Sequence, residues 1–414
     1  MVHAFLRTVA TTPPPHASIS DKLAATVGNT GNMLFETALA KQLRPEVQEI
    51  RRLEDIPQDL DHLVLSMSNF ISDATDLGPF VDILEARRVA NITMVGCGAQ
   101  AYDFGERPNL SEGTKRFISI LRERSASIGV RGIYTASVLE DMGIHNLDIV
   151  GCPSIYWPGP KGWPPFKGDQ SASGRFGIHC TPAGKYRDAV RSLIQYGMKH
   201  SATYICQTEI RYLEEGPQDT PDFLYYMGDS FLAQKAAEYF RHHGRIFFNL
   251  PEWIEHNRGL DFVLGARFHG NVVAMLAGRP SLLLVFDTRT REMADHFSLP
   301  YMDFADFDPD LPMQHYVDRS DFGMFHGTYP SRLIEYAGFL EKNNVPHNLF
   351  DDYWAVLPND GERQPYSRNL RRKLVHDAVL SKVDPEKFRK ESDTRLKPLR
   401  SADVRDAVEI GIAV

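Results

Sequence analysis

Arg267 and His269 have the side-chain types and the spacing to act on an anion. The segment 261–266, apolar after Asp261, is typical of a parallel strand, and the apolar run after it, closed by Gly278, is typical of a short helix. The pair is therefore predicted where a strand ends and a helix begins. Free backbone N–H groups and the helix dipole favour an anion at such a place. Arg267 adds a planar fork for phosphate or carboxylate, and His269 can hydrogen-bond or transfer a proton.

The same pair has a second, purely structural interpretation. In that interpretation Arg267 pairs with a surface carboxylate and His269 only caps the helix. For an isolated Arg-x-His the structural interpretation is favoured, so a site at Arg267 and His269 needs support from the rest of the chain.

The elements that would position these residues alternate, from Gly28 onward, between short apolar runs and amphipathic segments of helix length. In the first half we expect strands at 62–67, 92–96, 127–130 and 148–151, and helices at 32–42, 78–89, 112–123 and 136–142. In the second half we expect strands at 175–179, 203–206, 246–249, 261–265 and 281–286. The helices expected there are 183–199, 230–243, 252–257, 270–276, 289–297 and 331–342.

This alternation, in a chain of 414 residues, predicts an α/β fold with two Rossmann-like, doubly wound domains. We expect them to face each other across a cleft in a GT-B-like arrangement, with a helical C-terminal extension. The segment from Trp157 to Pro165 holds four prolines and two glycines, so it is predicted as an interdomain crossover. The expected parts are a flexible tail 1–20, a first domain 21–156, a crossover 157–174, a second domain 175–300, and a returning helix with an extension 301–414.

Composition and charge exclude several classes of protein. A net charge of −8 argues against a nucleic-acid-binding protein. The four cysteines form no CxxC pair, so neither a zinc site nor a disulfide framework is indicated. Neither a signal-peptide core nor an apolar run of membrane-spanning length is found in the sequence. We therefore predict a cytoplasmic protein. The basic run 371–373 is interpreted as a solvated face, and contact with the inner face of a membrane is the less favoured interpretation.

Several segments together resemble the signature of polysaccharide pyruvyltransferases. They are Gly265-Ala-Arg267-Phe-His269-Gly270 through Ala277-Gly278-Arg-Pro280, Phe286-Asp287-Thr-Arg289-Thr-Arg291-Glu292, Val95-Gly96-Cys97-Gly98-Ala99-Gln100, Gly129-Val-Arg131, and Gly143-Ile-His-Asn146 through Gly151-Cys152-Pro153-Ser154. The resemblance spans residues 28–300.

The resemblance implies that Arg131, Arg267 and His269 contact phosphoenolpyruvate, with Arg131 reaching the cleft from the first domain. Two arginines and a helix N-terminus suit a donor that carries both a phosphate and a carboxylate. An ordinary structural salt bridge is the alternative for Arg131. Phosphoenolpyruvate is then the donor substrate, with no cofactor. We expect no metal, because the histidines are scattered and none pairs with a carboxylate at metal-ligand spacing.

Four further residues were assigned to substrate binding with a structural alternative for each. Gly98 and Gln100 would bring backbone close to a ligand, or form a tight turn. Asn29 and Asn32 would bind the acceptor, although helix capping is favoured for both.

Two departures from the family pattern concern the acceptor side. Arg131-Gly132-Ile-Tyr-Thr135 stands where the family often shows Arg-Asp-x-x-Ser, and Asn29-Thr-Gly31-Asn32 lacks the acid of Asn-x-Gly-Asp.

For Asp287, Arg289 and Glu292, which open a predicted helix, we favour a structural role, with Glu292 near the first turn fitting capping and the helix dipole.

The resemblance implies a pyruvyltransferase that moves the enolpyruvyl group onto a sugar of an exopolysaccharide or cell-surface glycan, forming a pyruvate ketal. The partners would be phosphoenolpyruvate and a sugar or lipid-linked oligosaccharide acceptor, and His269 is our choice for the acid or the phosphate-side catalyst. One alternative is a GT-B glycosyltransferase that uses a nucleotide sugar, since the same frame would hold a diphosphate. Another is a non-catalytic sugar-binding or assembly protein, in which Arg267 and His269 only begin a helix.

Overall fold

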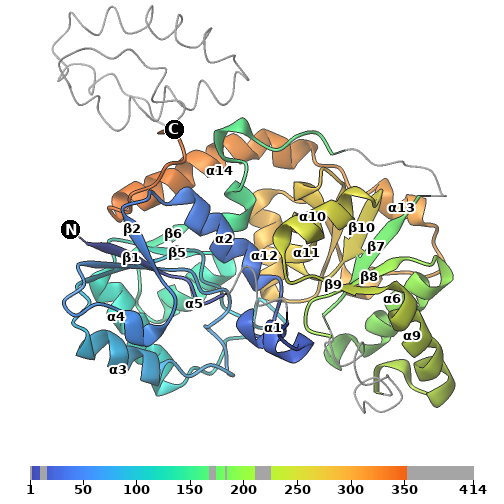
Figure 1. Ribbon diagram of the computed structural model, residues 1–414, viewed down its shortest axis with the longest axis horizontal. Coiled ribbons are helices and arrows are strands. Elements are labelled where there is room, and N and C mark those ends of the chain that lie inside the picture. The colour runs from blue at the N-terminus through green and yellow to red at the C-terminus, as the bar shows by residue number, and fades with distance from the viewer. Residues whose placement is uncertain (1, 10–15, 167–173, 182–183, 210–224, 352–414) are drawn as a thin grey trace, which may run out of the picture.

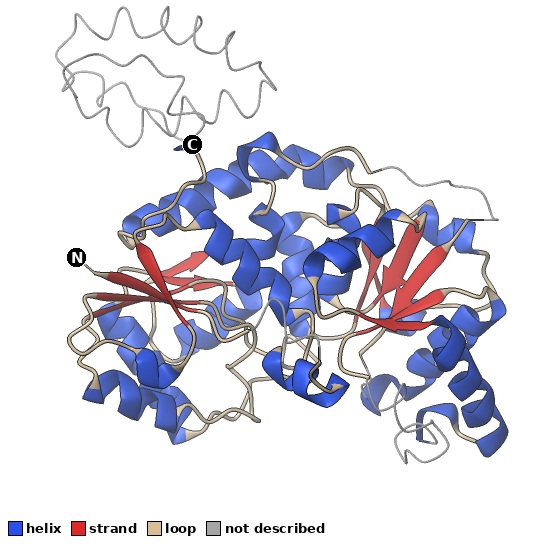
Figure 2. Cartoon of the chain, in the orientation of Figure 1, coloured by secondary structure: helices blue, strands red, loops and turns tan. Residues whose placement is uncertain are grey.

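The computed structural model describes residues 2–9, 16–166, 174–181, 184–209 and 225–351. Its ribbon shows two α/β halves, each built around its own sheet (Figure 1, Figure 2). All paired strands within the two halves are parallel. The predicted fold class, two Rossmann-like domains in a GT-B-like arrangement, is therefore confirmed.

The first sheet has the strand order β2-β1-β3-β4. Its strands are β1 (His3–Leu6), β2 (Val47–Ile50), β3 (His62–Leu65) and β4 (Asn91–Met94). A further parallel pair, β5 (Ile128–Val130) and β6 (Leu147–Ile149), continues from the end of β4, where the Gly96 N–H donates to the Gly129 carbonyl at 2.9 Å.

The flexible tail expected at 1–20 is wrong for residues 3–6, which form the buried strand β1 between β2 and β3. Phe5 packs in one buried cluster and Ala4 and Leu6 in another, because successive side chains of a strand point to opposite faces. A strand buried on both faces shows no alternation in sequence. Four residues were too few to distinguish it from a tail.

Helices cover both faces of the first sheet. They are α1 (Ile19–Ala25), α2 (Asn32–Gln42), α3 (Gly78–Ala86), α4 (Glu112–Arg124) and α5 (Ile133–Asp141). Figure 1 places α3 and α4 on one side of the sheet and α2 on the other. The apolar residues of α2 join the buried cluster that contains Phe5, while those of α3, α4 and α5 join the cluster that contains Ala4 and Leu6.

The second sheet has the strand order β12-β11-β10-β7-β8-β9. Its strands are β7 (Phe176–His179), β8 (Thr203–Cys206), β9 (Gly244–Ile246), β10 (Phe262–Gly265), β11 (Ser281–Val285) and β12 (Tyr301–Asp303). Its helices are α6 (Arg187–Lys199), α9 (Ser230–His243), α10 (Leu250–Arg258), α11 (Phe268–Leu276), α12 (Thr288–Phe297) and α13 (Met313–Val317). The chain builds outward from β7 in one direction and from β10 in the other. The switch point of this topology, where α/β sheets bind ligands, therefore lies between β7 and β10.

The returning helix α14 (Gly323–Lys342) joins the two halves. It begins at Gly323 rather than at 331, with Pro330 inside it. Tyr336 donates a hydrogen bond to Gln42 of α2 at 2.8 Å, and Arg332 donates to the carbonyl of His296 in α12 at 3.1 Å. Lys342 pairs with Asp148 of the first half at 2.9 Å. Within the crossover, Trp163 is buried against Phe325 of α14. The segment 371–373 and the rest of the expected C-terminal extension beyond 351 lie outside the described residues.

A search of the described helices found none with the length and hydropathy needed to cross a membrane.

Candidate active site

The predicted strand–helix junction at Arg267 and His269 is present, at the switch point of the second sheet. β10 ends at Gly265, Arg267 occupies the N-cap position, and α11 begins at Phe268. Gly270 allows the helix to pack on β7, since a Cβ there would lie 2.5 Å from Nε2 of His179. A side chain at this position would push the helix start away from the sheet. The glycine therefore fixes where Arg267 and His269 lie.

Arg267 is held by protein groups on three sides. It pairs with Glu209 at 2.6 Å, and its guanidinium also donates to the Thr208 hydroxyl at 2.6 Å and the Cys180 carbonyl at 2.7 Å. The side chains of Arg267 and Glu209 are only 8% and 1% exposed. Burial opposes the charge of Arg267, but the Glu209 carboxylate more than offsets this effect, and the pKa of Arg267 is raised. The structural interpretation predicted that Arg267 pairs with a surface carboxylate. Arg267 does pair with a carboxylate, but Glu209 is buried and follows β8.

Arg131 follows β5 in the first domain, and its environment differs from that of Arg267. It is 3% exposed, and its Nε donates to the Gly96 carbonyl at 2.9 Å. Among the described residues no carboxylate forms an ion pair with it. Burial lowers the pKa of Arg131, although the nearby Glu292 acts in the opposite direction, and a buried cation that forms no ion pair costs free energy. The ordinary salt bridge offered as an alternative for Arg131 is absent from the described part of the chain.

His269 lies between the two domains. Its Nε2 is 3.5 Å from the Cys152 sulfur, and its ring centroid is 5.4 Å from that of Phe35 in α2. Burial, followed by the charges of Arg131 and Arg289, lowers the pKa of His269 to about 3. The imidazole is therefore neutral near pH 7 while the site holds no anion. Both arginines therefore lie within electrostatic reach of His269.

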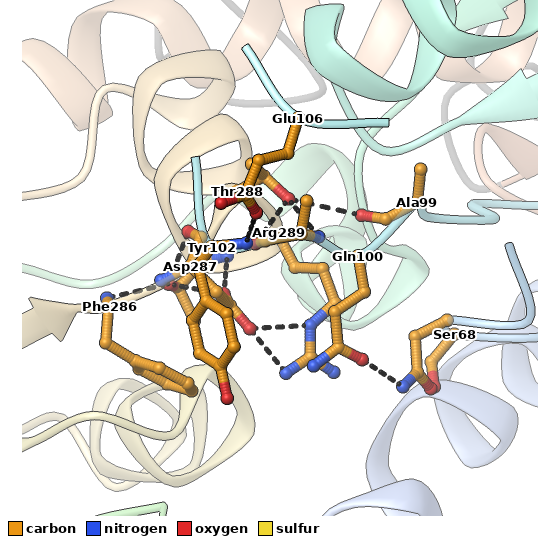
Figure 3. Close-up of polar contacts among 12 residues, drawn as sticks. Ser68, Ala99, Gln100, Tyr102, Glu106, Phe286, Asp287, Thr288 and Arg289 are labelled. Carbon is orange, nitrogen blue, oxygen red and sulfur yellow. Dashed lines mark hydrogen bonds and ion pairs between the residues drawn. The ribbon is translucent and has the colours of Figure 1, made fainter. Parts of the chain in front are cut away.

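Arg289 is the site residue that the sequence interpretation missed, because a structural role was favoured for it. It lies in the first turn of α12 and pairs with Asp287 at 2.6 Å (Figure 3). Asp287 is also the N-cap of α12, accepting the Thr290 N–H at 2.9 Å. The signal was available, since Asp287-Thr-Arg289 follows β11 as Arg267-Phe-His269 follows β10. These strands are neighbours, so the two junctions lie at one sheet edge.

The domains meet along a line of contacts that we call the domain seam. Ala101 donates its N–H to the Thr288 hydroxyl at 3.1 Å and accepts the Thr288 N–H at 3.0 Å (Figure 3). The Thr30 N–H of the first domain donates to the Gln207 carbonyl of the second at 3.1 Å. The seam therefore passes beside both helix starts of the site.

Gly98 and Gln100 lie at the first-domain side of the seam. A Cβ at Gly98 would lie 3.0 Å from Cδ of Arg131, so this glycine makes room for the arginine. Gln100 accepts a hydrogen bond from the Asn69 amide at 3.0 Å (Figure 3). Gly98 thus has a packing role in placing Arg131, while binding of a substrate by Gln100 stays a prediction.

The capping role expected for Asn29 and Asn32 is wrong. The N-cap of α2 is Gly31, which has no side chain with which to cap the helix. Asn29 instead accepts the Gly31 N–H at 2.9 Å, and Asn32 donates to the Thr26 carbonyl at 3.1 Å. Both amides shape the turn before the helix. A Cβ at Gly31 would lie 3.2 Å from Cβ of His269, so this turn borders the site and acceptor binding there stays a prediction.

The sequence suggested that Glu292 caps its own helix. In the structure it instead binds the start of α5, a helix of the other domain. Its two oxygens accept the N–H and hydroxyl of Thr135, in the first turn of α5, at 2.9 and 2.7 Å. Gly132 makes this approach possible, because a Cβ there would lie 2.5 Å from Cβ of Glu292. The carboxylate missing after Arg131 is thus replaced by one that comes across the domain seam.

Burial raises the pKa of Glu292 to about 7. The folded protein therefore holds this proton more tightly than the unfolded chain does, and the resulting stabilisation is lost as pH rises through about 7. We expect Glu292→Gln, which stays neutral, to gain melting temperature relative to the parent protein as pH rises from 5 to 8. The difference in the free energy of unfolding between the two proteins should grow by at most roughly 1.4 kcal/mol per pH unit.

Thermal melts of both proteins across this range test the expectation. Asp295→Asn, which removes an exposed carboxylate from the same helix, is the matched control and should show no such trend. A constant difference between Glu292→Gln and the parent would contradict it.

No group of three or more histidine, cysteine or acidic side chains within the described ranges is arranged to hold a metal ion. The four cysteines, all buried within those ranges, are free thiols. What the site offers is positive charge, with Arg131, Arg267 and Arg289 set against the carboxylates of Glu209 and Asp287. One positive charge is left over before the partly ionised Glu292 is counted, and that surplus is suited to a small anion.

Comparisons with known proteins give one clear result. No curated protein matches the sequence. Among solved structures, the UDP-GlcNAc 2-epimerase of Methanocaldococcus jannaschii is 14% identical over 78% of this chain and 85% of its own, with a TM-score of 0.36. The UDP-N-acetylglucosamine 2-epimerase of Rickettsia bellii is 11% identical over 76% and 80%, with a TM-score of 0.33. A model of the family described as polysaccharide pyruvyl transferase matches residues 29–288, which is more than half of the chain. The chain belongs to the polysaccharide pyruvyl transferase family.

Proposed function

We propose that the protein transfers the enolpyruvyl group of phosphoenolpyruvate to two hydroxyls of a glycan sugar, forming a pyruvate ketal. The observation that carries this proposal is the buried Arg131, which forms no ion pair with a carboxylate in the described chain and lies within electrostatic reach of His269. A small anion would supply the missing counter-charge. Phosphoenolpyruvate offers a phosphate and a carboxylate, which suit this arginine set and the N-terminus of α11.

The chemistry needs an acid and a site for the leaving phosphate. Protonation of the methylene carbon of phosphoenolpyruvate makes the neighbouring carbon cationic, and a sugar hydroxyl attacks it. Phosphate then leaves and the second hydroxyl closes the ketal. Of the two protons that the hydroxyls lose, one restores the acid and the other leaves with the phosphate. His269 is the proposed acid or phosphate-side catalyst. A bound anion would offset the charges of Arg131 and Arg289 and so raise the low pKa of His269.

We further propose that the protein needs no cofactor or metal, because arginines neutralise the donor. The free thiols Cys97, Cys152, Cys180 and Cys206 fit a reducing cytoplasm as the site of action. The acceptor would be a sugar or a lipid-linked oligosaccharide.

The direct test is incubation with phosphoenolpyruvate and a panel of glycosides, with and without EDTA, while phosphate release and product mass are followed. The expected product gains the mass of an added pyruvate less one water. A thermal-shift comparison in parallel should show stabilisation by phosphoenolpyruvate. Stabilisation by a nucleotide diphosphate alone would favour a glycosyltransferase instead, and no response to any phosphorylated compound would favour a non-catalytic role.

Arg131→Ala is expected to weaken phosphoenolpyruvate binding by roughly 1.5–3 kcal/mol, because it removes a charge-assisted contact. The fold should survive, since the arginine has no ion-pair partner in the described chain to leave uncompensated. Titration calorimetry measures the affinity, and circular dichroism checks the fold. Unchanged affinity, or an unfolded variant, would show that Arg131 is structural.

A further inference from the structure

An exposed aromatic ring borders the proposed donor site. Tyr102 is 44% exposed and directly follows Ala101, whose backbone pairs with Thr288 across the domain seam. Thr288 in turn precedes Arg289. Figure 3 shows the Tyr102 ring in the same close-up as the Asp287–Arg289 ion pair. A side chain this exposed contributes little to the core, and its ring is accessible to a ligand.

The Tyr102 ring is held in place from the second domain. Its centroid is 6.4 Å from that of Tyr186, and the Lys185 ammonium lies 5.1 Å from it. Tyr186 is itself backed by the buried rings of Phe286 and Phe304, each with its centroid 6.2 Å away. We call Tyr102, Lys185 and Tyr186 the aromatic platform. It is a supported surface with residues from both domains and not an isolated exposed residue.

The platform lies close to the charged part of the site. Burial raises the pKa of Tyr186, and the carboxylates of Asp303 and Asp287 add to this effect. The platform therefore lies within electrostatic reach of Asp287, the partner of Arg289.

The surroundings of the ring carry charges of both signs, which suits a neutral polyol. The loop Tyr102-Asp-Phe-Gly-Glu106 carries two exposed acids, and the platform adds the ammonium of Lys185, 5.1 Å from the ring. The carboxylates accept hydrogen bonds from sugar hydroxyls, and the ammonium donates them. A pyranose presents a face of C–H groups to an aromatic ring and hydroxyls at its edge. The amide of Gln100, two residues before the ring, adds further hydrogen-bonding groups.

We propose that the aromatic platform binds the acceptor sugar ring, stacked on Tyr102, with its hydroxyls directed toward the anion site of Arg131, His269 and Arg289. This assignment rests on the proposed pyruvyl transfer, since it is the acceptor half of that reaction. The same ring would also set which glycans are accepted, because the orientation of the hydroxyls decides which sugar face is free to stack.

The test compares three variants in the phosphate-release assay. Tyr102→Ala should raise KM for the acceptor about 3- to 10-fold and leave KM for phosphoenolpyruvate within about twofold. Tyr102→Phe keeps the ring and should behave like the parent protein. Phe231→Ala is the matched control, because Phe231 on α9 is 63% exposed and also carries a lysine, Lys235, at 4.5 Å from its ring. It should change neither constant.

A direct binding measurement keeps this inference separate from the proposed reaction. Saturation-transfer NMR with methyl glycosides of glucose, galactose and mannose should show contact with the parent protein and with Phe231→Ala, and loss of contact in Tyr102→Ala. If no pyruvyl transfer is found but this pattern holds, the donor chemistry fails and the sugar site stands. An unchanged acceptor KM or unchanged glycoside contact in Tyr102→Ala overturns the assignment, as does UDP competing for the ring.

Discussion

Arg267→Ala is expected to lower the free energy of unfolding by roughly 3–5 kcal/mol, because it leaves Glu209 as a buried carboxylate without its partner. The side chain of Glu209 is 1% exposed, and Arg267 binds one of its carboxylate oxygens. The other carboxylate oxygen accepts the backbone N–H groups of Gln207 and Thr208 at 2.8 and 2.9 Å. These backbone bonds cannot replace a cation. Urea denaturation followed by tryptophan fluorescence measures the loss.

Two further variants show whether the unpaired charge is the cause. Glu209→Gln combined with Arg267→Ala removes the stranded carboxylate and should recover part of the lost stability. Arg258→Ala breaks an exposed pair with Glu255 and should cost no more than about 1 kcal/mol. If Arg267→Ala keeps its stability but loses affinity for phosphoenolpyruvate, Arg267 is a ligand-binding residue whose pairing with Glu209 is incidental.

The sequence predicted those elements that follow from local pattern alone. The helices 32–42 and 230–243 and the strand 203–206 have the bounds of α2, α9 and β8. β2 was missed because its middle residues are exposed, so it shows one apolar residue at each end and no run. α14 was predicted from residue 331 but begins at Gly323, with Pro330 inside it. Packing against both domains overrides the local cost of that proline.

α5 shows the same limit at a helix start. It was predicted from residue 136 but begins at Ile133, with Tyr134 and Thr135 in its first turn. These residue types have low helix propensity. Glu292 accepts the Thr135 N–H and hydroxyl from the second domain, and 157 residues separate the two in sequence. No local pattern could disclose such a partner.

In the candidate site, too, the sequence predicted the local features but not the contacts between distant segments. The junction of Arg267 and His269 was predicted because a strand end followed by a helix start is a local feature. The pairing of Arg267 with Glu209 and the absence of an ion pair at Arg131 in the described chain depend on contacts between distant segments. The two arginines therefore differ in a way that the sequence did not predict, since Arg267 is paired with a buried carboxylate and Arg131 forms no ion pair in the described chain.

His269→Ala is expected to lower the turnover number by roughly 10²–10⁴-fold, with a smaller change in phosphoenolpyruvate binding, if His269 transfers a proton. In the free protein the pKa of His269 is lowered to about 3, so little imidazolium is present near pH 7. Bound phosphoenolpyruvate should raise that pKa. We therefore expect kcat to hold to higher pH than kcat/KM, because only kcat reports the complex.

His269→Gln distinguishes proton transfer from simple holding of the phosphate. Glutamine can hydrogen-bond but cannot exchange a proton near neutral pH, so under an acid role this variant should be as slow as His269→Ala. The control is His296→Gln, since His296 is a buried histidine in α12 whose pKa is also lowered to about 3 but which neighbours Arg332 rather than Arg131. It should keep near-native turnover. Near-native turnover in His269→Gln would instead limit His269 to phosphate binding and direct the search for the acid to Glu292, whose pKa of about 7 lets it hold a proton at the domain seam.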